Sequence, residues 1–504
     1  MSLLGIDIGT SGCRVLAFTP RGECIAQSHV EYDVVAPKSG YAELNTTEVW
    51  EKVSRCISNT AKSTNRDPIE AISISSIGEA LVPVSNDRSF LGPSILFFDR
   101  RGEEYVDVIT RAIDPDRIYQ ITGNAVGPHY SLPKLMWIKD HEPDLYRRAD
   151  RFLLWGGFIA YMLGAEPVID FSLANRTLLF DLDRRSWSEE LLAVGGIDRS
   201  KLPWIVQSGT HIGSVSNAAA SEHALPEGAA IVAGGHDQCV NATGCGVLQS
   251  GQAMYGMGTF LSAAPVFTQR YKSTETMLRL GLNTEHHTRP ERFVSFIYNQ
   301  SGCLVKWFRD TFAAAEHRED VQSGRETYTR LFAEIPESPV AVTALPYFTA
   351  TGPPGFYPDP RGSISGLELS TTRGEILKGI LQGIPLYLKK SIAALPEVGV
   401  ETTEFRAVGG GSKSDAWLQI SADILGIPIV RAAVTEAGAL GAAIIAGVGS
   451  EIFPSFEDGV KSMVTLERRF IPDLDRSELY DEMYGHYLYL EAQAEEHFRS
   501  KRHG

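Results

Sequence analysis

The sequence lacks long apolar runs and paired cysteines, and its first residues do not have the pattern of a secretory leader. Its 6 cysteines are scattered over 504 residues without a Cys-x-x-Cys pair, which argues against a disulfide framework and predicts free thiols in a reducing compartment. The most apolar stretch, Ala437 to Gly449, is far shorter than the roughly 20 residues that span a bilayer. Residues 1–12 show no basic segment or cleavage site of a signal peptide. We therefore expect a cytoplasmic protein that has no membrane partner.

Positive charge is also scarce, because 47 Lys and Arg residues stand against 62 Asp and Glu and the net charge is −15. This sign is wrong for a surface that gathers the phosphates of a nucleic acid, so we expect no nucleic-acid partner. HExxH, GxSxG and zinc-type Cys/His spacings are absent, which removes the usual support for a zinc hydrolase or a serine esterase. Lys413 lacks the preceding glycine of a P-loop, so a nucleotide would need another kind of cradle.

The composition is that of a folded protein, with 43% hydrophobic and 22% charged residues, and its length predicts about two domains rather than one core. Short apolar runs with β-branched residues, such as Ala71–Ile74 and Ile231–Ala233, alternate with helix-like segments such as Thr47–Ala61. This alternation predicts an α/β fold. Residues 3–18 have the pattern of two strands joined by a glycine turn.

Two segments of the second half have distinct local patterns. Residues 351–362 are dense in glycine and proline, which predicts a surface loop. Residues 477–499 carry Leu479, Met483, Tyr487 and Leu490 at helical spacing. They predict a terminal helix that packs this apolar face against the body of the protein.

One pattern occurs twice along the chain. Gly9-Thr10 lies upstream of Gly234-Gly235, and Gly258-Thr259 lies upstream of the glycine triplet 409–411, with an apolar run before each glycine group. Such a repeat is what an internal duplication leaves behind, and the two halves would meet near residue 248. Matches this short also arise by chance, so the pattern alone leaves both explanations open.

A compact polar set follows the first predicted strand: Asp7, Gly9, Thr10, Ser11 and Arg14. Glycines let backbone N–H groups approach an anion, the hydroxyls add donors, and a guanidinium binds phosphate bidentately. The acid would lie close enough to hold a metal ion through water. The structural alternative is an acid and an arginine that pair at a strand end.

A second acid, Asp237, follows Gly234-Gly235-His236 at the end of an apolar run. A carboxylate exposed there is well placed to accept a proton from a bound hydroxyl, although it could instead cap the next helix. We interpret His236 as structural. Farther on, Gly409, Gly410 and Gly411 remove the side-chain barrier on one side of the chain and could pass a base or phosphate closely, or form a tight strand-to-helix turn. Asp415 follows where its side chain could face the same pocket, and Trp417, Ile420 and Ile424 would face the core.

Taken in order, these segments resemble the FGGY carbohydrate kinases over nearly the whole chain. Residues 7–11 look like the opening phosphate loop of that family, and residues 97–101 are similar to its Trp-Gln-Asp-Arg-Arg segment. Residues 131–137 look like its first signature, with His129 where an aromatic residue, glycine, serine or methionine is usual, and residues 170–177 resemble its Asp-Tyr-Ser-Asn-Ala-Ser-Arg-Thr segment. Residues 362–367 with Glu375 and Gln382 resemble its second signature, although Gly379 departs from it, and residues 409–412 and 436–443 look like its closing nucleotide-side segments.

The resemblance implies two actin-like α/β domains of the ribonuclease H type, residues 1–247 and 248–504, with ATP and a sugar in the cleft between them. It also favours a genuine duplication. By this likeness Asp237 is the general base, and Asp7, helped by Asp237, holds Mg²⁺ through water. The residues implied to face ATP are Asp7, Gly9, Thr10, Ser11, Arg14, Gly258, Thr259, Gly302, Lys306, Gly409, Gly410, Gly411 and Asp415. The reaction would be in-line phosphoryl transfer, in which positioning and charge stabilisation supply most of the rate gain.

The sugar pocket is implied to contain Gly78, Glu79, Phe97, Asp99, His129, Asp237 and Gln238. Gly78-Glu79 differs from the Arg-Glu that glycerol kinases have in common and from the Met-His of xylulose kinases, whereas Asp237-Gln238 looks like the glycerol kinase pair. We therefore expect a xylulose kinase-like enzyme that phosphorylates a terminal hydroxyl of a small ketose or sugar alcohol. The alternatives are a glycerol or polyol kinase, an actin-like ATPase switch, and a sugar sensor without catalysis. The oligomeric state is left open, a homodimer included.

Overall fold

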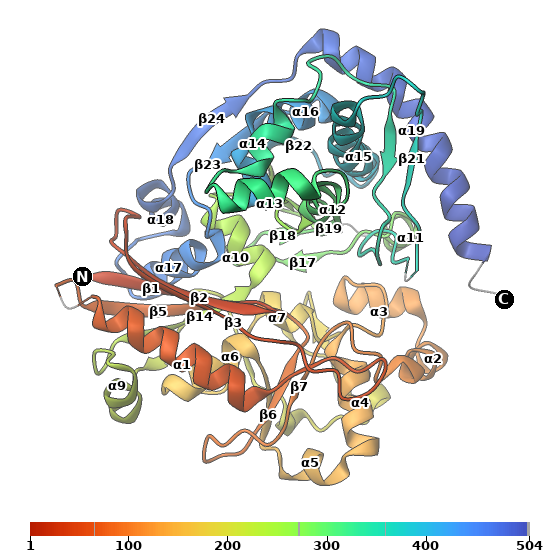
Figure 1. The fold of residues 1–504 in the computed structure, drawn as a ribbon. Helices are drawn as coiled ribbons and strands as arrows, with labels where there is room; N and C mark the ends of the chain where they lie inside the picture. The colour runs from red at the N-terminus through yellow and green to blue at the C-terminus, as the bar shows by residue number, and fades with distance from the viewer. Residues whose placement is uncertain (65, 271–272, 358, 501–504) are drawn as a thin grey trace.

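We describe a computed structural model of the chain, in which residues 1–64, 66–270, 273–357 and 359–500 are placed. Two large mixed sheets lie in the two halves of the chain, and helices cover both (Figure 1). None of the helices in the placed ranges is long and apolar enough to cross a membrane. All six cysteines lie in these ranges as free thiols, as expected.

The first sheet has the strand order β13-β14-β5-β1-β2-β3. Its centre is the predicted strand, turn, strand unit: β1 and β2 pair in antiparallel fashion, with Asp7 opposite Arg14. β5 joins β1 in parallel, and its crossover is α1, which covers the predicted helical segment. The strands are β1 (Ser2–Ile8), β2 (Gly12–Phe18), β3 (Cys24–Glu31), β5 (Ile69–Ser76), β13 (His211–Ser214) and β14 (Ala230–His236), and the helix α1 is Thr46–Lys62.

The second sheet repeats this topology. In both sheets the first strand pairs in antiparallel fashion with the second and the second with the third, while the fourth strand joins the first in parallel. A further strand then pairs in parallel with the fourth and carries an antiparallel edge strand on its other side. The chain order of this edge strand differs, because β13 precedes β14 whereas its counterpart is the last strand of the second sheet. The repeat is formed by β15 (Gly251–Met257), β16 (Phe260–Phe267), β19 (Ile297–Gln300), β22 (Thr402–Val408), β23 (Ile429–Ala432) and β24 (Leu466–Phe470), with β17 (Glu285–His286) and β18 (Phe293–Val294) beside β16.

The repeated topology supports a duplication, but one of the two sequence matches was wrong. The turns at Gly9 and Gly258 are equivalent, because each joins the first two strands of its sheet. Gly234-Gly235, however, lies on β14, whereas the glycine triplet follows β22. The equivalent of β22 is β5, so the first-half counterpart of the triplet is Gly78-Glu79.

The apolar segment Ala437–Gly449 forms the helix α17, which is buried on nearly every side. It lies against the first sheet although it belongs to the second half of the chain (Figure 1). Glycines allow the close approach, because a Cβ at Gly5 would stand 1.8 Å from the carbonyl oxygen of Ala439. A Cβ at Gly441 would stand 2.0 Å from the carbonyl oxygen of Val240 in α10 (Asp237–Gly244).

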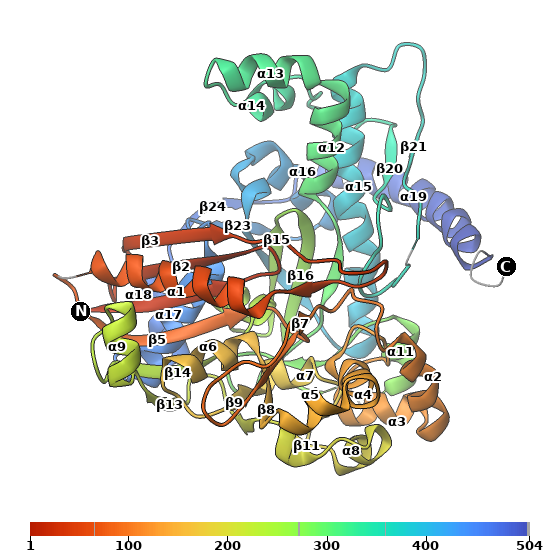
Figure 2. The same ribbon diagram turned by 60° about the horizontal axis from the view of Figure 1, so that its bottom comes forward.

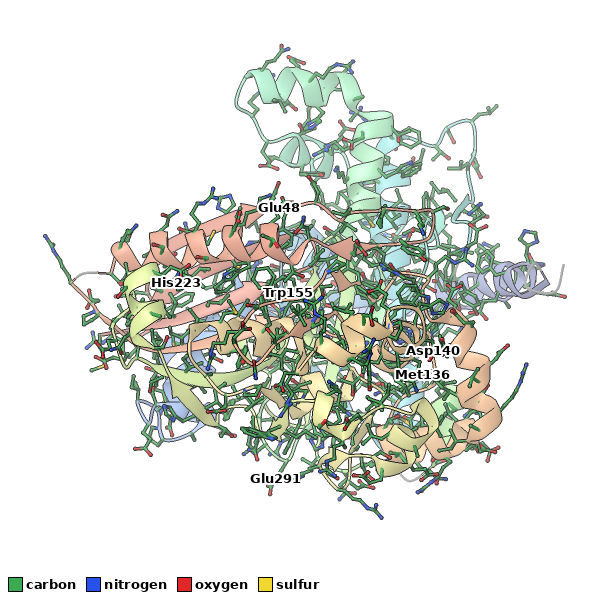
Figure 3. The ribbon with its side chains drawn as sticks, turned by 90° about the horizontal axis from the view of Figure 1, so that it is seen from below. Glu48, Met136, Asp140, Trp155, His223 and Glu291 are labelled. Carbon is green, nitrogen blue, oxygen red and sulfur yellow. The ribbon has the colours of Figure 1, made fainter. Side chains whose placement is uncertain are left out.

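A smaller sheet, β4-β7-β6-β8, extends the first half away from the main sheet. Trp155 at the start of α6 is buried between this sheet and the first one, and its indole donates to Ser94 Oγ at 3.1 Å. On the same face of the main sheet, Trp50 of α1 packs edge-on against Phe158 of α6, with ring centroids 5.8 Å apart. The helix α9 packs on α1, where His223, labelled in Figure 3, lies 3.1 Å from Ser54 Oγ and edge-on to Trp50. The elements of this part are β4 (Glu43–Leu44), β6 (Leu81–Val84), β7 (Ser94–Ile95), β8 (Arg151–Leu154), β9 (Val168–Asp170), β10 (Phe180–Asp181), β11 (Ser186–Trp187), β12 (Trp204–Val206), α2 (Glu103–Ala112), α3 (Pro115–Thr122), α4 (Ser131–His141), α5 (Pro143–Arg148), α6 (Trp155–Leu163), α7 (Phe171–Asn175), α8 (Glu189–Gly195) and α9 (Asn217–His223).

Helices α12, α15 and α16 cover the second sheet, and α13 and α14 project beyond them (Figure 2). The helix α19 runs along the outer edge as predicted and buries Tyr487, but Leu479 is 48% exposed, so the predicted apolar face was wrong at that residue. Its neighbour Tyr480 is buried instead. Residues 351–357 and 359–362 form no helix or strand, in agreement with the predicted loop, and Pro358 lies outside the described residues. The remaining elements are α11 (Thr274–Arg279), α12 (Gly302–Phe312), α13 (Ala314–Gln322), α14 (Thr327–Phe332), β20 (Thr343–Leu345), β21 (Ser363–Ser365), α15 (Arg373–Ala394), α16 (Asp415–Leu425), α18 (Phe456–Met463) and α19 (Leu474–Ser500).

Candidate active site

Asp7 lies at the carboxyl end of β1, the edge of an α/β sheet where ligands usually bind. Ser75 Oγ donates to Asp7 Oδ1 at 2.7 Å. Burial raises the pKa of Asp7, and the hydrogen bond from Ser75 opposes that rise. Gly438 of α17 faces the carboxylate, because a Cβ at that position would stand 2.5 Å from Asp7 Cγ.

Asp237 follows β14 and is the first residue of α10. Its side chain is 23% exposed, yet Oδ1 is buried and accepts no hydrogen bond from the described residues. Burial, together with the charges of Asp7 and Glu79, raises the pKa of Asp237 to about 7. The helix N-cap is His236, without a side-chain cap bond. The acid is therefore poised to exchange a proton near neutral pH rather than engaged in capping.

The segment before Asp237 is held by α7. Asp170 accepts from the backbone N–H of Ser172 at 2.8 Å, and Ser172 Oγ donates to the same carboxylate at 2.6 Å. Ser172 Oγ in turn accepts from the backbone N–H of His236 at 2.9 Å. Gly235 is needed beside this contact, because a Cβ there would stand 2.8 Å from Ser172 Oγ. The chain of bonds fixes the residue that immediately precedes the acid.

Glu79 follows β5 and is buried next to Gly78. The Arg176 guanidinium, at the end of α7, donates from Nε to Glu79 Oε1 at 2.7 Å. Burial raises the pKa of Glu79, and the charge of Arg176 opposes that rise. Because Glu79 raises the pKa of Asp237, the two acids lie within electrostatic reach of one another.

The other residues predicted for the sugar pocket differ in their surroundings. Gln238 Oε1 is buried without a partner among the described residues, which leaves it available to a ligand. His129 stacks on Phe356 of the second half at 5.5 Å between ring centroids, and burial, with the charge of Arg176, lowers its pKa to about 3. Phe97 is 37% exposed. Asp99 is buried and accepts from Arg101 N at 2.7 Å and from the Arg101 guanidinium, so its carboxylate is already bonded.

The residues predicted for the nucleotide form two groups. In the first half, the turn at Gly9 is closed by a bond from its N–H to the carbonyl oxygen of Gly12 at 2.8 Å, with Thr10 half-buried and Ser11 exposed between them. Arg14 Nε lies 3.0 Å from Glu436 Oε2, just before α17. This is the acid and arginine pairing that the sequence left open, although the partner is not Asp7.

In the second half, the start of α12 and the glycine triplet 409–411 converge on the turn at Gly258-Thr259. The backbone N–H of Gly302, at the start of α12, donates to the carbonyl oxygen of Gly258 at 3.0 Å. Gly409 has φ +92°, and a Cβ there would stand 3.1 Å from Gly258 N. Gly410 and Gly411 continue this bare backbone, and Lys306 is exposed one turn along α12. Asp415 pairs with Arg431 and Arg468, while Trp417, Ile420 and Ile424 are buried as predicted.

Sequence reasoning missed the residues that support the site. Arg176, Glu285 and Lys134 are buried charges whose partners lie far away in the chain. Lys134 Nζ donates to the carbonyl oxygen of Arg101 at 2.6 Å, and burial lowers its pKa to about 8. The sequence feature that could have indicated Lys134 and Arg176 is their position within residues 131–137 and 170–177, the two segments that resemble FGGY kinase segments.

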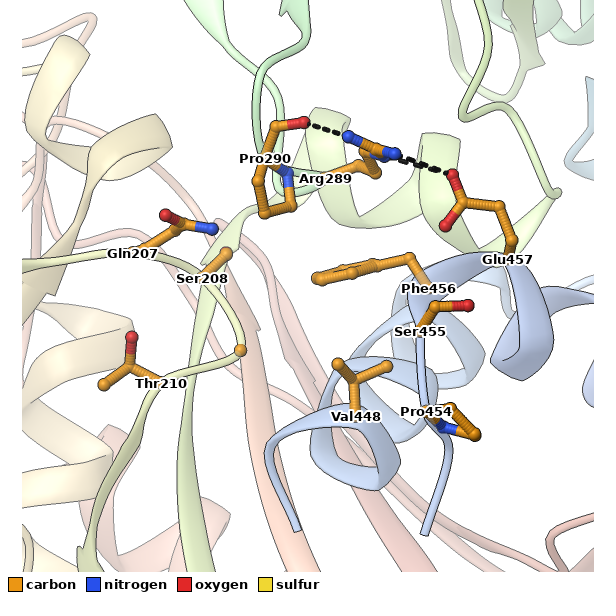
Figure 4. Close-up of a pocket in the computed structure, with 11 residues that line it drawn as sticks. Gln207, Ser208, Thr210, Arg289, Pro290, Val448, Pro454, Ser455, Phe456 and Glu457 are labelled. Carbon is orange, nitrogen blue, oxygen red and sulfur yellow. Dashed lines mark hydrogen bonds and ion pairs between the residues drawn. The ribbon is translucent and has the colours of Figure 1, made fainter. Parts of the chain in front are cut away.

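A separate cavity of about 460 Å³ lies between the loop 207–210 and α18 (Figure 4). Its wall includes Arg289, which lies 3.0 Å from Glu457, and the ring of Phe456. None of the residues predicted for sugar or ATP lines it. The cavity is therefore separate from the candidate active site at the strand ends.

The donors at the strand ends suit a hard cation that keeps much of its water. Asp7 and Asp237 are partly buried carboxylates, and the charge of Asp7 raises the pKa of Asp237, so a divalent ion near them would relieve that repulsion. Among the placed residues no group of three or more His, Cys, Asp or Glu side chains could hold a metal ion. The residues present thus fit Mg²⁺ bound largely through water and phosphate oxygens.

Two family models and several known proteins match the chain. The model of the N-terminal domain of the FGGY family of carbohydrate kinases matches residues 2–244, and that of the C-terminal domain matches residues 256–450. A xylulose kinase of Bacillus subtilis is 28% identical, over 96% of this chain and 95% of that protein. A glycerol kinase of Methylibium petroleiphilum is 30% identical, over 95% and 97%. The crystal structure of xylulose kinase from Rhodospirillum rubrum, 24% identical, has a TM-score of 0.88 over 99% of this chain and 100% of that one, which confirms the predicted α/β fold of two actin-like domains.

Proposed function

The chain belongs to the FGGY family of carbohydrate kinases, and on that premise we propose that it transfers the γ-phosphoryl group of ATP to a terminal hydroxyl of a small ketose or sugar alcohol. The observation that carries this proposal is the state of Asp237. Burial and the charges of Asp7 and Glu79 raise its pKa to about 7, and its buried Oδ1 accepts no hydrogen bond from the described residues, with His236 Nε2 nearby at 3.3 Å. A carboxylate of this kind is matched to removing a proton from a hydroxyl near neutral pH.

In this reaction Asp237 accepts the proton of the acceptor hydroxyl while the oxygen attacks the γ-phosphorus in line with the leaving ADP. Glu79 and Gln238 bind other hydroxyls of the acceptor, and Phe97, Asp99 and His129 border the same pocket. Gly78 leaves room for the Arg176 side chain beside Glu79. The rate gain comes mainly from holding the hydroxyl and the phosphorus in attacking geometry, because phosphoryl transfer requires little further chemistry from the protein.

The nucleotide lies between the two glycine turns. Gly9, Thr10, Ser11 and Arg14 face the phosphates from the first half, and Gly258 and Thr259 from the second. Gly302, Lys306, Gly409, Gly410, Gly411 and Asp415 line the rest of the nucleotide site. Mg²⁺ would be held by Asp7 and Asp237 through water, and when bound it neutralises charge on the phosphates.

The domain division that supports this picture is 1–247 for the sugar side and catalytic base and 248–504 for the nucleotide side. The family models, which match residues 2–244 and 256–450, are compatible with it. A reducing cytoplasm suits six free thiols. We make no choice between monomer and homodimer.

The names of the relatives suggest which acceptors to consider first, but they do not identify the acceptor of this chain. One is named a xylulose kinase and another a glycerol kinase, at 28% and 30% identity. A ketose of about five carbons is therefore our first choice, and a polyol such as glycerol is the second. The pair Asp237-Gln238 is the feature that favours the second choice, because it looks like that of glycerol kinases.

The test is ADP release from ATP and Mg²⁺ with pentuloses, hexuloses, tetritols, pentitols and glycerol, each against a blank without acceptor. Turnover that depends on one ketose or polyol supports the proposal and identifies the substrate. Turnover only with glycerol selects the second choice. Rapid ADP release in the blank that no acceptor increases would instead indicate an ATPase switch. Binding of an acceptor, measured by calorimetry, without any ADP release would indicate a sensor.

A further inference from the structure

Arg176 is the only link that the described hydrogen bonds show between Glu79 and the second half of the chain. Its Nε and Nη2 both donate to Glu79 Oε1, the former at 2.7 Å, and its Nη1 donates to Glu285 Oε1 at 2.5 Å. The three side chains are 13%, 7% and 0% exposed, so this is a desolvated ion triad rather than a surface pair. Removing one member would leave a buried charge without its partner.

The path of Arg176 depends on the missing side chain at position 78. A Cβ on Gly78 would stand 2.8 Å from Arg176 Cγ and 3.1 Å from its Cβ. Glu79 itself has φ +60° in a tight turn closed by Ala80 N and the carbonyl oxygen of Gly78 at 2.6 Å. A residue other than glycine is strained there and keeps that conformation only where its surroundings hold it. Arg176 is the group that holds the side chain.

The far end of the triad is equally fixed. Glu285 Oε1 also accepts from Asn283 Nδ2 at 2.7 Å. The neighbouring strand residue His286 donates its backbone N–H to Asn175 Oδ1 at 2.9 Å, which ties β17 to the end of α7. The guanidinium lies over the ring of Tyr130 at 5.1 Å. Arg176 is thus held by both halves of the chain at once.

The pairing of Arg176 determines the charge of the pocket. Two carboxylates already share the guanidinium, and Asp237 and Asp7 add negative charge nearby. The rings of His129 and His236 carry no compensating charge, because burial lowers the pKa of both, that of His129 to about 3. The nearby cations are already engaged, because Arg176 bonds to two carboxylates and Lys134 donates to the carbonyl oxygens of Asp99 and Arg101. An acidic acceptor would therefore enter a site without an available cation, whereas a neutral polyol meets the Glu79 oxygen that Arg176 leaves unbonded.

We propose that Arg176 is a positioning residue that orients Glu79 toward the hydroxyls of the acceptor, and that its double pairing restricts the pocket to neutral polyhydroxy acceptors and excludes sugar acids. This inference rests on the proposed kinase function. On this proposal the acceptor is uncharged, and Arg176, Glu79 and Glu285 determine this preference. Glu285 acts through Arg176 and does not itself contact the acceptor.

The first experiment compares Arg176→Lys, Gly78→Ala and the control Gly485→Ala, where a Cβ meets nothing within 4 Å. Gly78→Ala displaces Arg176 without removing a charge. We expect KM for the neutral acceptor to rise about 10- to 100-fold in both site variants, the loss expected of a charge-assisted contact. KM for ATP should stay near that of the control, and a thermal melt of each variant establishes that it is folded under the assay conditions. An unchanged acceptor KM in Gly78→Ala and Arg176→Lys overturns the positioning role.

The second experiment tests whether the pairing of Arg176 with Glu285 excludes negatively charged acceptors from the pocket. Glu285→Gln leaves a guanidinium N–H of Arg176 without its carboxylate, so the aldonate with the carbon number of the accepted sugar should become a competitive inhibitor of the variant. The wild-type enzyme should show at least about tenfold weaker inhibition by it. An aldonate that binds both proteins equally, or that the wild type phosphorylates, overturns the inference while leaving the kinase intact. A wild type without any acceptor-dependent ADP release overturns the proposed function first, and this inference with it.

Discussion

Replacing Gly438 by alanine tests the placement of Asp7 without touching an ionisable group. Gly438 is the second residue of α17, and a Cβ there would stand 2.5 Å from Asp7 Cγ and 2.6 and 2.7 Å from the two carboxylate oxygens. Ordinary contact begins at 3.4 Å. The carboxylate must therefore move by about 0.9 Å to reach ordinary contact, and this shift alters the geometry of its 2.7 Å bond from Ser75.

The size of the effect follows from this displacement. A misplacement of about 1 Å in a catalytic site costs on the order of a hundredfold in rate, so we expect Gly438→Ala to lose about 10- to 100-fold in kcat. The helix itself should not suffer. Gly438 does not have a left-handed backbone, and alanine inside a helix is about 1 kcal/mol more favourable than glycine.

The assay is acceptor-dependent ADP release measured across a Mg²⁺ titration, with a thermal melt of each protein. Gly438→Ala should need more Mg²⁺ for half-maximal rate, because Asp7 is proposed to hold the ion through water, while Gly485→Ala in α19 should behave as wild type. A folded Gly438→Ala enzyme with normal kcat and normal Mg²⁺ dependence would refute the reasoning, since the carboxylate would have moved without consequence.

Three further predictions concern the acids of the site. Asp237→Asn should lower kcat by about 10²- to 10⁴-fold with ATP affinity by calorimetry nearly unchanged, and a variant with wild-type turnover would contradict its role as base. In the wild type, kcat/KM for the acceptor should rise with pH through about 7 and then level off, because Asp237 accepts a proton only when ionised; a pH-independent profile would argue against it. Glu79→Ala should raise KM for the acceptor about tenfold or more and leave KM for ATP unchanged, whereas an effect confined to ATP would mean that the pocket is misplaced.

The sequence predicted the layers of the fold better than the contacts between them. Alternating β-branched runs and amphipathic segments located β5, β14 and α1, because this periodicity reflects burial along a single element. Leu479 is a residue for which helical spacing alone predicted burial wrongly. Its spacing fits an apolar face, but α19 runs along the edge of the second sheet, so only part of that face has anything to pack against.

For the candidate site too, local sequence patterns located some residues, whereas residues defined by long-range contacts were missed. Glycines and acids at strand ends could be found from the sequence, because each follows an apolar run directly. Arg176 could not be, since its partners Glu79 and Glu285 lie 97 and 109 residues away. Nor did the pattern reveal that Asp99 is already bonded to Arg101. Local patterns give the type of residue at a strand end, whereas long-range contacts decide whether its polar atoms are free.

The duplicated topology explains how one frame can serve two ligands. The strands β1, β5 and β14 of the first sheet are followed or ended by Asp7, Glu79 and Asp237. Their equivalents β15, β22 and β23 are followed or ended by Gly258, Gly409 and Ala432. Carboxylates at the second set of positions would repel the phosphates of a nucleotide, whereas at the first set they can accept hydrogen bonds and a proton from a hydroxyl. In the proposed arrangement the acceptor therefore meets acids at the first set of strand ends, the nucleotide meets small residues at the second set, and Asp7 and Asp237 lie where we propose that the two ligands meet.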